Sequence, residues 1–183
     1  MRRVEEMSGD YVLDPSHSRI GFVARHAMVT RVRGQFLDFT GRAHVDFTDP
    51  AASWVQVDVA VASVDTRDPH RDEHLRTNDF FDAPHHPTIA FRSRSVEEVG
   101  PRIHRIRGDL TIKATTRPVA IDFEYTGAAK DPFGNTRLGF EGSTQIKRSD
   151  YDVVWNAPLE TGGVLVSDTV TLEFEISALP ATD

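Results

Sequence analysis

The sequence predicts an all-β fold of eight antiparallel strands with one short helix. Three observations carry this prediction: apolar and polar side chains alternate in eight segments, turn-forming residues separate the segments, and helical signals occur in only one stretch. With 183 residues and no cysteine, the chain has the length of one domain whose core needs no disulfide. We expect an N-terminal extension over residues 1–10 and one β domain over residues 11–180.

The predicted strands are short segments in which every second side chain is apolar. In the second of them Phe39, Val45 and Phe47 share one face, because successive strand side chains point to opposite sides. Asp38 and Arg42 then lie on the other face. The segments, in order, are Ile20–His26, Leu37–Phe47, Val55–Val61, Thr88–Arg92, Ile106–Ile112, Val119–Tyr125, Leu138–Ile146 and Val170–Ile176.

Turn and helix signals lie between the strands. Thr48-Asp49-Pro50 and the run from Asp131 to Asn135 contain the proline, glycine and asparagine that are typical of turns. The stretch from Asp68 to Asn78 is predicted to be helical, because Asp68 suits an N-cap and Pro69 suits the first helical turn.

Eight strands that each present one apolar face can stack as two sheets or close into a barrel. The alternation alone does not separate these architectures. We favour the barrel, because closure removes the exposed strand edges that a sandwich retains. The interior of an eight-stranded barrel is either filled by side chains or holds one small ligand.

The charge and the N-terminus argue against several classes of protein. The net charge is -7 and no basic stripe occurs, so we expect no nucleic-acid partner. Two arginines near the start are followed by no apolar run, so we expect no secretion signal, no membrane span and a cytoplasmic location. The excess of arginine over lysine is common in GC-rich bacterial genomes, and we attach no function to it.

Histidines form the most suggestive polar motif. The run from His70 to His74 matches H-x-x-E-H, a zinc-protease pattern in which two histidines bind zinc beside a glutamate base. A catalytic zinc needs a third ligand on a supporting element, and the rest of the chain predicts strands. We therefore favour a short helix that closes one barrel end, with Arg71 and Asp72 in local ion pairs, and predict no metal ligand. A metal-dependent hydrolase, or a metal site that adds His85 or His86, stays as an alternative.

Large side chains near the strand ends are candidates for ligand contacts. His26 shares a face with Phe22, so it is either a core histidine bonded to a neighbouring strand or a polar contact for a ligand head group. Phe80, Phe81 and Trp155 either cap the core or line an entrance to it. The sequence contains no nucleophile elbow, phosphate-binding glycine loop or dinucleotide fingerprint, so we predict no catalytic residue.

Several dispersed motifs, in order over residues 11 to about 178, resemble the YceI-like family of lipid-binding, lipocalin-like proteins. The matching segments are Asp14–His26, Gly34–Phe36, Phe39–Gly41, Ser63–Thr66, Arg71–Leu75, Asp79–Ala83, Pro87–Phe91, Gly108–Ile112, Arg117–Val119 and Arg148–Tyr151. The resemblance implies an eight-stranded antiparallel lipocalin-like barrel with a long apolar pocket for an isoprenoid chain, such as a quinone or a prenyl pyrophosphate. The family pattern uses His74 but not His70, which makes the zinc-protease match accidental. The family usually has Arg-x-Asp-Phe-Gly where this chain has Arg148–Asp152, so Tyr151 stands for phenylalanine and Asp152 for glycine, and the segment that follows carries Trp155 and Pro158. Many relatives are periplasmic and have a cleaved leader, which we do not expect here.

From these arguments we expect a binding protein rather than an enzyme, which carries, stores or sequesters an isoprenoid quinone or polyprenyl pyrophosphate. The predicted ligand contacts are Phe22, His26, Phe39, Val57, Phe81, Phe91, Leu110, Phe123, Trp155 and Phe174. A pyrophosphate head would meet Arg25, Arg31 and Arg33, whereas a quinone would need only a donor such as His26. The alternatives are a histidine-based metal-binding protein, an enzyme acting on a lipophilic substrate, or an interaction domain with a solid core. The sequence leaves a homodimer open.

Overall fold

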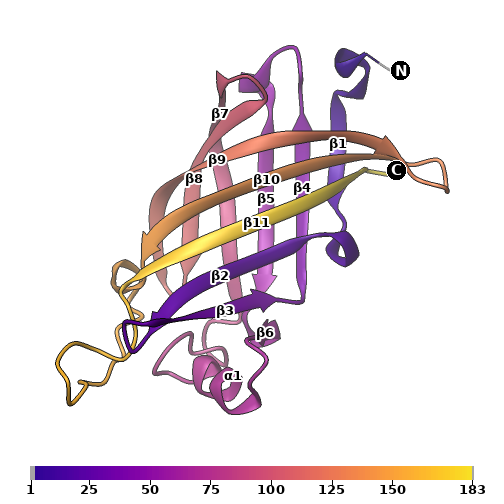
Figure 1. Ribbon diagram of the computed structural model, residues 1–183. Coiled ribbons are helices and arrows are strands. Elements are labelled where there is room, and N and C mark those ends of the chain that lie inside the picture. The colour runs from indigo at the N-terminus through magenta and orange to yellow at the C-terminus, as the bar shows by residue number, and fades with distance from the viewer. Residues whose placement is uncertain (1–2, 183) are drawn as a thin grey trace.

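The computed structural model describes residues 3–182, and its strands form one sheet that closes on itself (Figure 1). The strands of the described chain are β1 (Gly9–Leu13), β2 (Arg19–His26), β3 (Thr30–Phe36), β4 (Phe39–Val45), β5 (Trp54–Ala60), β6 (Val64–Asp65), β7 (Thr88–Gly100), β8 (Ile103–Ile112), β9 (Thr115–Lys130), β10 (Thr136–Lys147) and β11 (Thr169–Pro180). The helix is α1 (Pro69–Arg76). Short 3-10 turns occur at Val4–Met7, Pro15–His17, Pro50–Ala52, Val61–Ser63 and Arg148–Tyr151.

Three long strands are each broken in two. Pro15–His17 lies between β1 and β2, residues Leu37 and Asp38 lie between β3 and β4, and Val61–Ser63 lies between β5 and β6. With each broken strand counted once, the described residues form a closed antiparallel barrel of eight strands. β11 closes the ring, because it pairs with β1 near its own end and with β2 near its own start. The predicted barrel is therefore confirmed.

The predicted segments overlap β2, β4, β5 and β7 to β11, whereas the sequence missed β1, β3 and β6. β3 was missed because its inward residues include Gly34 and only two larger apolar side chains, Val32 and Phe36, between arginines and a glutamine. β6 has only two residues and pairs with the end of β3. A fragment that short carries no alternation of its own.

The predicted helix forms where expected and ends early. The Asp68 carboxylate accepts hydrogen bonds from the backbone N–H groups of His70 and Arg71, at 3.0 and 3.2 Å, as an N-cap does. The helix ends at Arg76 rather than Asn78, because Thr77 adopts an extended backbone and its hydroxyl donates to the His74 carbonyl at 2.6 Å. α1 lies beneath one end of the barrel (Figure 1).

The described part of the N-terminal segment packs on the barrel. β1 begins at Gly9, two residues before the predicted start of the domain, because Gly9 and Asp10 pair with β4. The Tyr11 hydroxyl donates to the Met7 carbonyl at 2.6 Å, and both side chains are buried.

Apolar side chains form two separate clusters along the barrel. The larger one lies toward α1 and its buried members are Leu13, Phe36, Phe39, Val59, Val61, Val64, Phe80, Ile89, Leu110, Ile112, Tyr151 and Val153. The smaller one lies near the N-terminal segment, and its buried members are Met7, Tyr11, Tyr125, Leu138 and Ala178. The two clusters leave the middle of the barrel to be lined by half-buried side chains.

Candidate ligand-binding cavity

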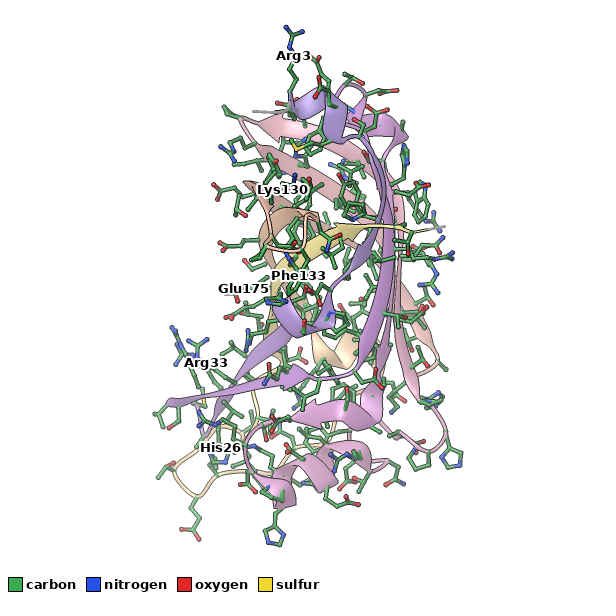
Figure 2. All side chains as sticks on the ribbon, turned by 90° about the vertical axis from the view of Figure 1, so that its right-hand side faces the viewer. Arg3, His26, Arg33, Lys130, Phe133 and Glu175 are labelled. Carbon is green, nitrogen blue, oxygen red and sulfur yellow. The ribbon has the colours of Figure 1, made fainter. Side chains whose placement is uncertain are left out.

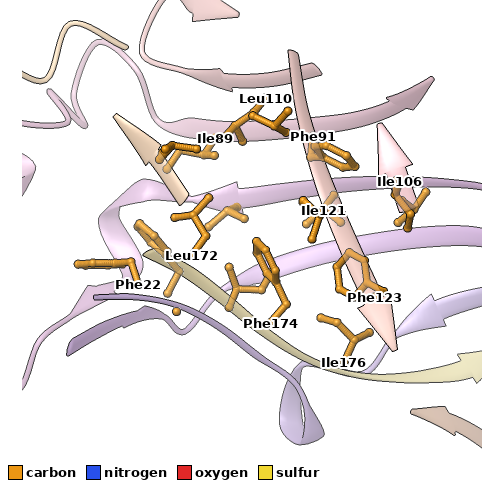
Figure 3. A pocket seen from close by; sticks show the side chains of 18 of the residues that line it. Phe22, Ile89, Phe91, Ile106, Leu110, Ile121, Phe123, Leu172, Phe174 and Ile176 are labelled. Carbon is orange, nitrogen blue, oxygen red and sulfur yellow. The ribbon is translucent and has the colours of Figure 1, made fainter. Parts of the chain in front are cut away.

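A cavity of about 300 Å³ occupies the barrel interior. Figure 3 shows ten of its wall residues pointing toward one another across this space from opposite sides of the barrel. These labelled residues are Phe22, Ile89, Phe91, Ile106, Leu110, Ile121, Phe123, Leu172, Phe174 and Ile176. The volume lies at the lower end of the range of about 300 to 1,000 Å³ that is usual for small-molecule sites.

The wall is almost entirely apolar. Polar groups in the described lining are restricted to the ends: His44, Asp46, Ser53 and His104 lie near the β4–β5 connection and the start of β8, and Arg148 and the Tyr151 hydroxyl lie near the α1 end. The middle of the wall consists of aliphatic and aromatic residues, which present no hydrogen-bonding group to a ligand. Such a surface binds by excluding water from an apolar molecule.

Wall residues in the middle of the barrel are only half-buried, although they point inward. Phe22, Phe91, Leu172 and Phe174 all retain exposed surface, whereas the side chains of the two end clusters are buried. In a filled core these residues would touch one another, because protein interiors are close-packed. Their remaining exposed surface faces the cavity, so the barrel is hollow rather than solid.

Two glycines allow aromatic rings to lie flat against the wall. Gly34 is directly opposite Phe22, and a Cβ atom at Gly34 would lie 2.2 Å from the Phe22 ring. Gly142 is opposite Phe123, and its Cβ atom would lie 2.7 Å from that ring. Any larger residue would push the ring inward. The glycines therefore help to keep the cavity open.

The structure places seven of the ten predicted contacts in the cavity lining: Phe22, Val57, Phe81, Phe91, Leu110, Phe123 and Phe174. The other three lie elsewhere. Phe39 is buried, with 3% of its surface exposed, in the cluster toward α1. His26, expected to face the interior, is exposed at the end of β2, because this strand runs beyond the cavity and bridges to Val166 there.

Trp155 belongs to an aromatic plug rather than to the cavity wall. The His74 ring packs edge-on against Trp155 and Phe80, with centroid distances of 4.8 and 5.0 Å. The His74 Nε2 atom lies 2.8 Å from a carboxylate oxygen of Asp79. This cluster covers the α1 end of the barrel.

His70 and Glu73, the other two residues of the zinc-protease match, do not join His74 in a cluster. His70 and Glu73 are exposed on α1, and Glu73 pairs with Arg76. Within residues 3–182 no group of three or more histidine, cysteine, aspartate or glutamate side chains lies close enough to hold a metal ion. The histidine-based metal site stays an untested alternative.

The arginine and aspartate of α1 hold the helix to the barrel. The buried Asp72 carboxylate accepts from the backbone N–H and the hydroxyl of Thr66, at 2.8 and 2.6 Å. Arg71 donates to the Thr66 hydroxyl oxygen and to its carbonyl, both at 2.7 Å. The predicted ion pairs of Arg71 and Asp72 do not form within the described residues, because both side chains bind Thr66 instead.

Arg148 holds the loop after β10 against the end of the barrel. Its guanidinium donates to the carbonyls of Val153 and Trp155 at 2.8 and 2.9 Å and to that of Ser167 at 2.9 Å. A longer contact of 3.3 Å reaches the Val166 carbonyl. Burial lowers the pKa of Arg148, and these carbonyls compensate for the lost hydration. The sequence offered no signal for this role, because the partners are all backbone atoms.

A second depression, of about 540 Å³, lies between β9 and β10. The two strands pair only as far as Asp122 and Ser143 and then separate toward α1. Arg117, Lys147 and Asp150 are among the lining residues of this side slot.

Tyr151 lines both the cavity and the side slot. It is 2% exposed, and burial raises the pKa of its hydroxyl to about 12. None of the hydrogen bonds among the described residues involves this hydroxyl. Tyr151 is therefore an available polar group beside an apolar space, and it is not among the contacts predicted from the sequence.

Comparison with known proteins identifies the family. The sequence model of a protein family, described as the YceI-like domain, matches residues 11–178. The chain belongs to the YceI-like family. A UPF0312 protein of Ectopseudomonas mendocina is 39% identical over 151 residues, which cover 81% of this chain and 79% of that protein. A UPF0312 protein of Azotobacter vinelandii is 37% identical over the same shares of the two chains.

Solved structures share the YceI-like barrel. Burkholderia cenocepacia BcnA superposes with a TM-score of 0.80 at 25% identity, covering 93% of this chain and 99% of that one. The YceI protein of Campylobacter jejuni gives a TM-score of 0.74 at 28% identity, over 86% and 90% of the two chains. A polyisoprenoid binding domain from Saccharophagus degradans gives a TM-score of 0.69 at 15% identity, over 93% of this chain and 98% of that one. At this low identity the similarity shows the fold alone. Among the described residues of this YceI-like chain, no helix is both long and apolar enough to cross a membrane.

Proposed function

We propose that this YceI-like protein binds an isoprenoid lipid, a quinone or a polyprenyl pyrophosphate, and carries, stores or sequesters it with the tail inside the barrel. The observation that carries the proposal is the cavity, whose middle is lined by aliphatic and aromatic side chains that remain half-buried. The protein would act by binding, without a catalytic step. A branched, flexible apolar chain suits a wall that offers shape and no polar contacts.

The energetics of burial are sufficient for such a ligand. Each buried methylene contributes ~0.8 kcal/mol, so a tail of about fifteen carbons gains roughly 12 kcal/mol before the costs of association. Micromolar affinity requires about 8 kcal/mol. The tail therefore supplies most of the affinity, and the head group adds selectivity.

The head group has two candidate environments near the α1 end. The Tyr151 hydroxyl could donate to a quinone carbonyl. Arg117 and Lys147 at the side slot could attract a pyrophosphate, although Asp150 lies beside them. The Arg148 guanidinium is already surrounded by backbone carbonyls and is the weaker candidate. Binding that weakens strongly with added salt would favour the pyrophosphate, because only a charged head is screened.

A related fold supports the same class of ligand. The Saccharophagus degradans protein is a polyisoprenoid binding domain, and its barrel superposes on this one at 15% identity. That similarity establishes the fold, so the choice of ligand rests on the cavity.

Native mass spectrometry of freshly purified protein, together with solvent extraction, tests the proposal. We expect a co-purifying prenyl lipid, or an empty protein that binds added quinone or prenyl pyrophosphate with one-to-one stoichiometry. An empty protein that takes up neither compound would overturn the proposal. A stoichiometric metal that is lost on substituting His70 or His74 would instead favour the metal alternative.

A further inference from the structure

The hairpin formed by β2 and β3 projects beyond the barrel end, beside the loop that follows β10 (Figure 1). Its turn exposes large apolar side chains: Met28 is 61% exposed and Val29 is 76% exposed. Val164 of the neighbouring loop is 43% exposed. Met28 lies against Gly163, where an added Cβ atom would be 2.4 Å from its sulfur. We call Met28, Val29 and Val164 the apolar tip.

The backbone of the turn is unusual for the residues that it holds. Ala27 and Met28 have φ values of 50° and 63°, in the left-handed region that glycine, asparagine and aspartate adopt most easily. Methionine is not a residue that favours this backbone conformation, so the turn itself does not explain its presence at this position. Its long, flexible, apolar side chain rests partly on Gly163 and leaves most of its surface exposed to a partner.

Positive charges lie immediately behind the apolar tip. Arg25 is directly opposite Arg31 in the hairpin, and Val23 is opposite Arg33 on the same outer face. Figure 2 shows Arg33 and His26 on this projecting hairpin. Like charges directly opposite each other destabilise a strand pair. In the described chain the side chains of Arg25 and Arg31 have no acidic partner.

Glu173, an acidic residue next to this face, neutralises it only in part. Glu173 on β11 is shared between Arg19 and Arg33, at 3.4 Å from each. The net charge of the chain is -7, so this cluster of arginines is opposite in sign to the protein as a whole. Arg25 and Arg31 thus remain without an ion-pair partner in the described chain, and Arg33 shares Glu173 with Arg19.

We propose that the β2–β3 hairpin docks on the surface of an anionic lipid bilayer. Met28, Val29 and Val164 would enter the boundary between head groups and acyl chains, while Arg25, Arg31 and Arg33 bind lipid phosphates. This order, apolar at the apex and cationic behind it, fits a bilayer, whose charge lies outside its apolar interior. A nucleic acid would meet the apolar apex before the arginines. A second copy of the hairpin would bring like charges together.

The hairpin is also joined to the end of the cavity. The Ala27 N–H donates to the Leu165 carbonyl at 2.7 Å, and the Ser167 N–H donates to the Arg25 carbonyl at 3.1 Å. Val166, between these two loop residues, lines the cavity. Docking would therefore place the α1 end of the barrel next to the membrane, where an isoprenoid could be taken up or delivered. This last step rests on the proposed function, whereas docking does not.

Vesicle sedimentation tests the docking surface. The probes are phosphatidylcholine vesicles with and without about one third phosphatidylglycerol, at low and at physiological salt. We expect the protein to bind the anionic vesicles and to be released by salt. Each arginine near an anionic surface contributes about five-fold, so R25Q/R31Q should weaken binding about 25-fold. M28S/V29S should reduce it at least ten-fold at both salt concentrations.

A double variant at exposed sites away from the hairpin, R42Q/F133S, is the matched control and should bind as the natural protein does. Far-ultraviolet circular dichroism and the thermal midpoint establish that each variant is folded. The inference fails if the natural protein does not sediment with anionic vesicles at low salt, or if the hairpin variants bind the vesicles as well as the control does. It fails equally if the hairpin substitutions abolish only self-association or oligonucleotide binding. Quinone binding without vesicles should survive in the hairpin variants, so loss of cavity binding and loss of docking are separate outcomes.

Discussion

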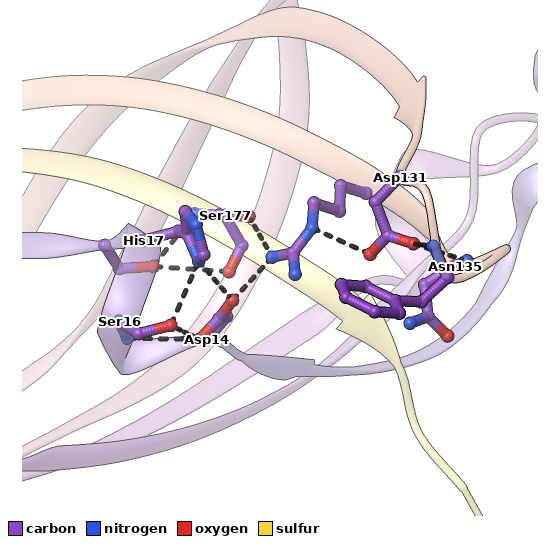
Figure 4. Close-up of polar contacts among 9 residues, drawn as sticks. Asp14, Ser16, His17, Asp131, Asn135 and Ser177 are labelled. Carbon is purple, nitrogen blue, oxygen red and sulfur yellow. Dashed lines mark hydrogen bonds and ion pairs between the residues drawn. The ribbon is translucent and has the colours of Figure 1, made fainter.

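The Arg137 guanidinium on β10 donates to the carboxylate of Asp14, which lies in the break between β1 and β2 (Figure 4). Asp14 also accepts from the N–H and the hydroxyl of Ser16, at 3.1 and 2.7 Å. Arg137 donates in addition to Asp131 at 3.1 Å. β11 passes between the two elements, and there it changes its partner from β2 to β1. The pair therefore secures the seam at which the barrel closes.

Removal of the seam pair should destabilise the protein. The Arg137 guanidinium, first among several hydrogen-bond donors, holds the pKa of Asp14 well below its usual range. We expect Arg137→Met to lower the free energy of unfolding by about 2 kcal/mol, the usual contribution of hydrogen bonds to charged groups. Urea denaturation at neutral pH measures this change. Arg105→Met is the matched control, because Arg105 and Asp122 form an exposed pair that should contribute less to stability than the seam pair.

The same pair should make the stability of the protein depend on pH in the acidic range. A carboxyl whose pKa is lowered by folding stabilises the native state above its unfolded pKa, roughly 3.9, and this contribution is lost as the pH falls further. Asp14→Asn should therefore be less stable than the natural protein at neutral pH and should lose less stability on acidification. Parallel denaturation curves for the two proteins at every pH would contradict this assignment.

Gly34→Ala should partly close the cavity. The new methyl group would lie 2.2 Å from the Phe22 ring, so the ring must turn inward. We expect a loss of about 1 to 3 kcal/mol in stability, typical of overpacking, and weaker ligand binding. Combining Gly34→Ala with Phe22→Leu should restore binding, because the smaller side chain makes room. Gly100→Ala is the control, since the nearest atoms to its Cβ are 3.8 Å away.

Leu172→Trp tests whether the interior is the binding site. Leu172 is half-buried and faces the cavity from β11, so an indole ring can occupy the space that a ligand needs. Ligand binding should fall at least ten-fold while the barrel stays folded. Thr171→Trp, one position away on the opposite face, should bind normally. Equal binding by both variants would show that the ligand sits elsewhere.

Tyr151→Phe should change stability little at neutral pH, because the hydroxyl has no hydrogen bond among the described residues. Burial raises the pKa of Tyr151 to about 12, whereas an unfolded tyrosine titrates near 10. Its neutral form therefore stabilises the fold fully below roughly pH 10, and this contribution declines as the pH rises toward 12. Alkaline denaturation of the natural protein should show that decline, and the variant should show a smaller one. A fall in quinone affinity in the variant would place the head group beside Tyr151.

Alternation predicted the inward direction of the wall residues but not their depth. Phe39 opposes Val59, and Phe91 opposes Val57, two positions earlier in β5. Phe39 is buried in the packed end and does not line the cavity, whereas Phe91, Val57 and the buried Val59 do. Phe39 and Phe91 look alike in sequence. The register of the strands and the position of α1 decide which of the two meets empty space.

Residues whose roles depend on distant neighbours were harder to predict. Arg148 and Gly34 belong to segments that matched the family. The sequence does not show that Arg148 binds loop carbonyls or that Gly34 makes room for the Phe22 ring. These roles depend on partners in distant parts of the chain. Met28 and Val29 were not singled out, because an exposed hairpin tip is recognised only when the turn has been located.

The seam between the first and last strands also has a consequence for synthesis. The Ser18 hydroxyl bonds the Ser177 carbonyl across 159 positions, and β1 cannot pair with β11 until residue 180 has been made. The barrel therefore cannot close before β11 has left the ribosome. Long-range pairing of this kind slows folding and leaves strand edges open in the interval. A nascent chain of this protein would need protection from aggregation until its final strand arrives.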